Sequence, residues 1–222
     1  MNRFLSRKEA FNLIEEGESL RCEFKRKFSE HEKIAKEIIA FANTKGGFLF
    51  IGIDDDKTVY GVQSEKSELD LILETVQNYC EPPIPVEWMF LNVDQKEVVI
   101  IKIPESKVKP HRIQDYKESI DLNDASVYIR VNDKSILASK QMIRLLKNSS
   151  EGKELIKYSI GELEKAVFKF LEKSETINVE QLCNSANISH RRASRTLVKM
   201  VRAGLLYIHN KDNGEEFFTH AG

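Results

Sequence analysis

One stretch in the first quarter of the chain constrains the fold more than any other. Apolar residues recur at helical spacing over 34–42, the Gly46-Gly47 pair then supplies the backbone conformations that end a helix, and an apolar run follows over 48–53. Three successive aspartates occupy 54–56 directly after that run. Because adjacent carboxylates are costly inside a strand, we predict a helix, a tight turn and a buried strand whose end reaches solvent or a site.

The same periodicities predict the other elements of an α+β domain with a mixed sheet and packed helices. A strand over 18–25 carries Arg21, Glu23 and Lys25 on one face, and Trp88 and Phe90 are interpreted as core residues rather than as a platform for stacking bases. The further predicted helices lie between residues 6 and 17 and over 30–42, 67–79 and 139–148; the further predicted strands cover 47–53, 57–62, 86–93, 97–103 and 127–131.

A second, smaller domain is predicted at the carboxyl end. The small polar residues that begin at 149 indicate a linker over 149–157, which separates a domain over 1–148 from one over 158–222. Helices are predicted over 161–173, 179–186 and 189–203, followed by strands over 205–209 and 216–219 that form a hairpin. This order of elements is that of a winged helix-turn-helix domain.

Charge is balanced over the whole chain but not within this second domain. The formal net charge is -1, so any binding of a polyanion depends on local clustering. No acidic residue occurs from 181 to 211. The last predicted helix begins with Ser189 and His190. If the domain is a DNA-binding helix-turn-helix, the start of this helix would enter the major groove. The alternative is a domain that binds proteins, in which the positive residues form only a solvated helix face. The candidate nucleic-acid contacts are Ser189, His190, Arg191, Arg192, Arg195, Lys199 and Lys211.

The first domain offers a group of carboxylates. Glu18 and Glu23 belong to one predicted strand, and Asp55 follows another, so these carboxylates and Lys25 converge if the two strands are neighbours. Convergence would suit metal-dependent cleavage of a phosphodiester. On the residues alone, solvated carboxylates at strand ends are the more common explanation.

Other residues narrow the class of protein. The cysteines Cys22, Cys80 and Cys183 are odd in number and widely spaced, which is typical of reduced thiols in a cytoplasmic protein. The histidines show no metal-ligand spacing, so no zinc is expected. The sequence contains neither the apolar core of a signal peptide nor an apolar run long enough for a membrane span, so no membrane partner is expected.

One set of residues in the first domain forms a recognisable motif: Glu18, Glu23, Phe24, Lys25, Ile39, Phe41, Ala42, Asn43, Thr44, Gly46, Gly47, Leu49, Ile51, Gly52, Ile53, Asp54, Asp55 and Gly61. A closing segment follows at Lys109-Pro110-His111 and at 127–131 through 138–139. Through these residues, roughly residues 5 to 147 resemble a known family, the Schlafen AlbA-like domain. Domains of this family are described as DNA-binding and occur in predicted bacterial and archaeal transcriptional regulators. A winged helix after the domain is similar to the architecture of those regulators.

The resemblance implies two uses of the domain. The first is a cytoplasmic transcriptional regulator that binds double-stranded DNA without a cofactor. The second is a Mg²⁺- or Mn²⁺-dependent endoribonuclease acting on structured RNA such as transfer RNA. Animal Schlafen proteins cleave transfer RNA with two glutamates and an aspartate, whose matching positions are Glu18, Glu23 and Asp55, and they combine two such lobes in one chain. A homodimer would supply the second lobe here.

Overall fold

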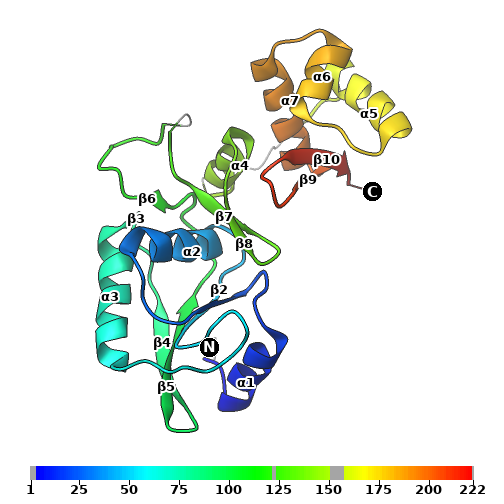
Figure 1. Ribbon diagram of the computed structural model, residues 1–222. Helices are drawn as coiled ribbons and strands as arrows, with labels where there is room; N and C mark the ends of the chain where they lie inside the picture. Colours follow the sequence, from blue (N-terminus) through cyan, green and yellow to red (C-terminus); the bar gives the residue numbers. More distant parts are fainter. Residues whose placement is uncertain (1–3, 122–123, 151–157, 222) are drawn as a thin grey trace. The chain divides into compact units, whose positions relative to one another are not determined.

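The computed structural model describes residues 4–121, 124–150 and 158–221 (Figure 1). The chain divides into two compact units, the first ending at Leu137 and the second beginning at Ala138. None of the helices in these described ranges combines the length and apolar character that crossing a bilayer requires.

The first unit is built on a four-stranded mixed sheet with the order β1-β2-β5-β4. β1 and β2 are parallel, and α2 connects them, whereas β2 pairs with β5, and β5 with β4, in antiparallel fashion. This arrangement confirms the predicted α+β class. The strands of the sheet are β1 (Cys22–Lys25), β2 (Gly47–Ile51), β4 (Glu87–Val93) and β5 (Lys96–Ile103).

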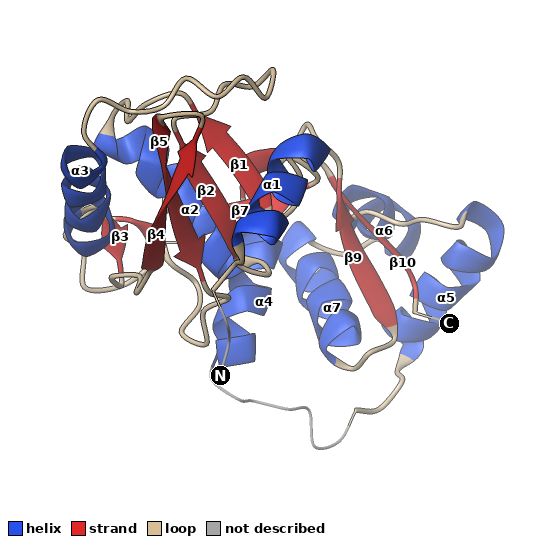
Figure 2. Ribbon diagram, turned by 90° about the horizontal axis from the view of Figure 1, so that it is seen from below, coloured by secondary structure: helices blue, strands red, loops and turns tan. Residues whose placement is uncertain are grey.

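Helices cover both faces of this sheet (Figure 2). Alternation along β5 sends Val99 and Ile101 to the face covered by α2 and α3, and sends Val98 and Ile100 to the opposite face, covered by α1. β2 divides its side chains in the same way, so the central strands are buried on both faces. The helices are α1 (Arg7–Glu16), α2 (His31–Asn43) and α3 (Glu65–Asn78).

The turn between α2 and β2 requires both glycines, for different reasons. Gly46 has a φ of 67°, the left-handed conformation expected after a helix, and its amide donates to Phe41 O at 2.9 Å. A Cβ on Gly47 would lie 2.4 Å from Cδ1 of Phe41 and 2.7 Å from Arg21 O. The turn is therefore confirmed, but the second glycine serves close packing rather than helix termination.

Several predicted strands are shorter than expected. The strand predicted over 18–25 begins only at Cys22, because residues 18–21 form a turn. The return strand predicted over 57–62 is reduced to a single bridge between Ile53 and Val59. Short pairs complete the unit: β3 (Cys80–Glu81) with β6 (Arg112–Ile113), and β7 (Tyr128–Val131) with β8 (Lys134–Leu137).

The interpretation of Trp88 and Phe90 as core residues is wrong. Their side chains are 45% and 44% exposed. They alternate with Met89 and Leu91, which pack on the α1 face, and β4 is an edge strand with a neighbour on one side only. Strand periodicity showed correctly that the two aromatic residues share a face, but not that this face is left open.

The second unit contains the predicted three helices and hairpin after one further helix. Its main core joins side chains of α5, α6 and α7 to Leu206 and Phe218 of the hairpin. The order of elements is as predicted, while assignment to the winged helix class remains a prediction. The elements are α4 (Lys140–Ser150), α5 (Glu162–Ser174), α6 (Val179–Ala186), α7 (His190–Arg202), β9 (Leu206–Asn210) and β10 (Glu216–His220).

The position of α4 differs from the expected domain organisation. Ser139 begins the helix, as predicted, and its Oγ accepts from the amides of Gln141 and Met142, both at 3.1 Å. This helix belongs to the second unit rather than closing the first, since Arg144 donates to Ser194 Oγ at 2.8 Å. Of the linker predicted over 149–157, the first two residues continue α4, and 151–157 lie outside the described residues.

Candidate nucleic-acid interface

α6 and α7 are joined by a short turn that is specified by local sequence. Asn187 ends α6 in the left-handed conformation, with a φ of 50° and a ψ of 52°, which asparagine tolerates better than most residues. Two residues later Ser189 caps α7, and its side chain accepts from the amide of Arg192. The start of α7 is therefore fixed by a cap on its first turn.

α7 has one buried side and one cationic side. The buried side includes Ala193, Leu197 and Val198, as predicted, together with Ser194, Thr196 and Met200. The opposite side carries four exposed cations, Arg191, Arg192, Arg195 and Lys199, which we call the cationic face. Their spacing of three or four residues aligns them along the helix. Among the residues that the structure describes, none of these four side chains forms an ion pair.

A hollow of about 380 Å³ lies beside the cationic face, between α7 and the start of α5. Arg192, Arg195 and Lys199 line it on one side, and Glu162 and Glu164 line it on the other. Both glutamates bond within their own segment instead: Glu162 pairs with Lys165 at 2.8 Å, and Glu164 accepts from the amide of Gly161 and the hydroxyl of Tyr158, both at 3.0 Å. The cationic face is thus not neutralised by the nearest acids.

The other predicted contacts are placed less uniformly. His190 is the first residue of α7 and is exposed, beside the Ser189 cap. Lys211 follows β9 rather than lying on α7, and its Nζ pairs with Glu215 at 2.8 Å. The cationic face and Lys211 therefore belong to different elements of the unit.

In the first unit, Glu18 and Glu23 are held at the start of β1. The Glu18 side chain accepts from the amide of Phe24 at 2.9 Å. Burial is the main reason why the pKa of Glu18 is raised above its usual range, the Phe24 bond opposes that rise, and the charges of Glu23 and Asp55 add to it. The acidic groups therefore influence one another, although Asp55 itself lies exposed in the turn after β2.

Glu23 is 6% exposed and is neutralised by cations of the protein. Its Oε1 accepts from Lys25 and its Oε2 pairs with Nη1 of Arg130 at 2.7 Å. The same Nη1 lies 3.1 Å from Glu37 Oε2, and Nη2 donates to Ser19 O at 2.7 Å. Glu23 and Glu37, from two different elements, thus share one buried guanidinium.

This arrangement does not fit a divalent metal centre. Within the described parts of the chain, no group of three or more His, Cys, Asp and Glu side chains is placed to hold a metal ion. Mg²⁺ and Mn²⁺ need several oxygen ligands directed at one point. Both Glu23 oxygens are directed at Arg130 and Lys25 instead, and the Glu18 carboxylate caps the Phe24 amide.

Sequence reasoning missed the buried polar residues that hold this region together. Arg130 is fully buried, its guanidinium lies 4.7 Å from the centre of the Phe41 ring, and its Nε has no hydrogen-bond partner among the described residues. Asn43 bonds both the amide and the carbonyl of His111, each at 2.8 Å, and His111 is itself buried. The available signal for Arg130 was a lone charge in the short apolar strand over 127–131.

Comparison with known proteins connects the first unit to a family. The family model described as "Schlafen, AlbA_2" matches residues 18–139, which is more than half of the chain. Among solved structures, the N-terminal domain of an ATP-dependent DNA helicase RecG-related protein from Nitrosomonas europaea is 17% identical, with a TM-score of 0.36 over 44% of this chain and 71% of that one.

The DIP2311 protein from Corynebacterium diphtheriae is 14% identical, with a TM-score of 0.45 over 91% of this chain. The match spans 34% of that longer protein. The family model thus confirms the resemblance found in the sequence motif, and the chain belongs to the Schlafen AlbA_2 family.

Proposed function

We propose that the protein binds double-stranded DNA through the cationic face of α7 and acts as a transcriptional regulator. The observation that carries the proposal is the exposure of four aligned cations without ion-pair partners in the described residues. Arginine and lysine in this arrangement neutralise phosphates, and arginine also forms bidentate hydrogen bonds with guanine in the major groove. Membership of a family associated with nucleic acids supports the same conclusion.

The α6–α7 arrangement supports entry of α7 into the major groove. In a helix-turn-helix the second helix lies in the groove and its amino-terminal residues contact base edges. Here those residues are His190, Arg191 and Arg192, directly after the Ser189 cap, while Arg195 and Lys199 follow along the helix. We assign sequence reading to the first group and phosphate contact to the second.

We further propose that the protein works as a homodimer in the cytoplasm. Two copies of α7 related by a two-fold axis would read two half-sites about one helical turn of DNA apart, roughly 34 Å. Light scattering after size exclusion should give twice the monomer mass, and a monomer at micromolar concentration would contradict the assembly without affecting the contact residues.

The proposal does not extend to RNA cleavage. Metal-dependent cleavage would require Glu18, Glu23 and Asp55 to direct oxygens at a shared ion, whereas Glu23 is bound by Arg130 and Lys25. Among the described residues, the contacts of Glu23 are those of a buried ion-pair network with Arg130 and Glu37, and none of them favours a role in cleavage.

Charge reversal on α7 tests the proposal. The variant Arg191→Glu/Arg192→Glu should lose binding to duplex DNA in a mobility-shift assay run at several salt concentrations, because two attractive charges become repulsive at the groove. The matched control is Lys169→Glu/Lys173→Glu, which reverses two exposed cations of α5 away from the hollow. Equal binding by the wild type and the α7 variant would refute the proposal.

A further inference from the structure

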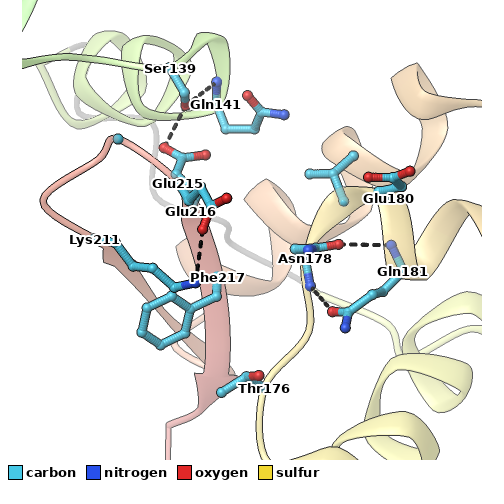
Figure 3. Close-up of a pocket in the computed structure, with 12 residues that line it drawn as sticks. Ser139, Gln141, Thr176, Asn178, Glu180, Gln181, Lys211, Glu215, Glu216 and Phe217 are labelled. Atoms are coloured by element: carbon cyan, nitrogen blue, oxygen red, sulfur yellow. Dashed lines mark hydrogen bonds and ion pairs between the residues drawn. The ribbon is translucent and has the colours of Figure 1, made fainter.

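The second unit contains a hollow that the cationic face does not use. It has a volume of about 520 Å³, within the range of about 300 to 1,000 Å³ typical of small-molecule sites. Its walls come from the starts of α4 and α6 and from the hairpin end of β10 (Figure 3). It shares no lining residue with the cationic face.

The charges that line this hollow are mainly negative. Glu180, Glu215 and Glu216 contribute carboxylates, and Lys211 contributes the one cation among its lining residues. That cation is already paired, since Lys211 Nζ lies 2.8 Å from Glu215 Oε2. Glu180 and Glu216 therefore determine the net charge that a ligand would meet.

Of the two carboxylates Glu180 and Glu216, only Glu216 is partly buried. Ser139 donates its hydroxyl to Glu216 Oε1, and no hydrogen bond to Oε2 comes from the described residues. Burial raises the pKa of Glu216 above its usual range, and the Ser139 bond opposes that rise. A cation placed beside the free oxygen would favour the ionised carboxylate and replace the water that burial has removed.

Side-chain caps occupy part of each helix start around the hollow. At α4, Ser139 Oγ accepts from the amides of Gln141 and Met142. At α6, Asn178 and Gln181 cap one another through two hydrogen bonds of 2.8 Å, visible as the paired dashed lines in Figure 3. These amides already have acceptors, so they are not available as donors to an anion in the hollow.

Gln141 provides an independent indication of a ligand. The residue is only 7% exposed, yet its side-chain amide has no hydrogen-bond partner in the described part of the chain. It lines the hollow, and Figure 3 shows the amide directed away from Ser139 into the space between α4 and the Asn178–Gln181 cap. A ligand that bonds this amide gains affinity, because the amide lines the hollow and has no partner among the described residues.

We propose that this hollow binds a small organic cation, a primary ammonium compound with an apolar body. The ammonium group donates to Glu216 Oε2 and to the Gln141 amide oxygen, and Glu180 adds long-range attraction. Val179 and Phe217 line the hollow with apolar surface for the body of the ligand. This inference is independent of DNA binding, because it uses none of the cationic face.

Benzylamine is a suitable probe, with benzyl alcohol and benzoate as neutral and anionic analogues of similar shape. Amide chemical shifts of the full ¹⁵N-labelled chain should change saturably with benzylamine, and the affected amides should belong to residues that line the hollow. Glu216→Gln should weaken binding at least about tenfold, since it keeps an acceptor for Ser139 but removes the charge. Gln141→Leu should weaken it less, and the distant Lys169→Ala should leave it unchanged.

Three results with the wild-type protein would overturn the inference. They are the absence of saturable shifts with benzylamine, equal binding of benzyl alcohol, and tighter binding of benzoate. If Glu216→Gln does not fold, Glu180→Gln serves instead, because this residue is exposed on α6 and its loss should still reduce the affinity for benzylamine but not for benzyl alcohol. Unchanged affinity in a folded Glu180→Gln or Glu216→Gln variant would also contradict the proposed site.

Discussion

Replacement of Arg130 by methionine tests the energetic role of the buried charge network. The change removes a fully buried guanidinium from between Glu23 and Glu37, whose side chains are only 8% and 11% exposed. Removing one partner of a buried ion pair costs about 3–5 kcal/mol, because a charge is left without compensation in a poorly solvated place. Here one cation serves two carboxylates, which favours the upper part of that range.

Two features of the site reduce this figure. Lys25 remains beside Glu23 and neutralises it in part, and methionine no longer buries the unpartnered Nε donor of Arg130, which returns about 1 kcal/mol. We therefore expect a net loss of about 3 kcal/mol in the free energy of unfolding of the first unit. With a urea dependence of about 2 kcal/mol per molar, the midpoint should fall by about 1.5 M.

Urea unfolding followed by tryptophan fluorescence measures this loss, because Trp88 is the only tryptophan and reports on the first unit. Lys33→Met is the control: it breaks an exposed pair with Glu30, and no measurable change is expected. The triple change Arg130→Met with Glu23→Gln and Glu37→Gln should recover most of the loss, since neither buried carboxylate then carries an uncompensated charge. A loss below about 1 kcal/mol in the single variant would refute the reasoning.

Three further predictions concern the first unit. Burial lowers the pKa of His111 from its usual 6.5, so the unfolded chain binds more protons than the folded one, and stability should fall as the pH drops below about 6.5. His111→Gln should flatten that dependence in urea titrations at several pH values, and an unchanged slope would contradict it. Gly47→Ala should destabilise by about 1–3 kcal/mol or more, since its Cβ would lie 2.4 Å from the Phe41 ring, and an unchanged urea midpoint would show that the turn yields. Transfer RNA incubated with Mg²⁺ or Mn²⁺ should remain intact, and cleavage that disappears in Glu23→Ala would show that the carboxylates act despite Arg130.

Local pattern was sufficient for most elements of the fold. β2 follows from an unbroken apolar run after Gly47, and the hairpin of β4 and β5 follows from two β-rich runs on either side of a short loop. α7 follows from apolar residues at helical spacing after Ser189. These signals depend on residues close together in the chain. They therefore predict where an element lies and which side chains share a face.

Long-range neighbours could not be predicted in the same way. Whether the face of Trp88 and Phe90 is covered depends on how far the helices extend over an edge strand, and no local pattern encodes that distance. The partner of Glu23 lies 107 residues away, at Arg130, so the sequence presented an acidic group where the structure has a neutralised one. The Schlafen-like motif correctly located the residues but left their chemistry open.

The salt dependence of DNA binding tests the central claim most directly. Each phosphate contact contributes about 0.9 to the slope of log K against log salt concentration, so replacing Arg195 and Lys199, which we assign to phosphate contact, by alanine should reduce the slope by up to about 1.8. Fluorescence anisotropy of a labelled duplex, measured between about 50 and 200 mM salt, gives this slope for the wild type and the variant. The account predicts a weaker affinity and a shallower slope for the variant, and an identical affinity and slope would contradict it.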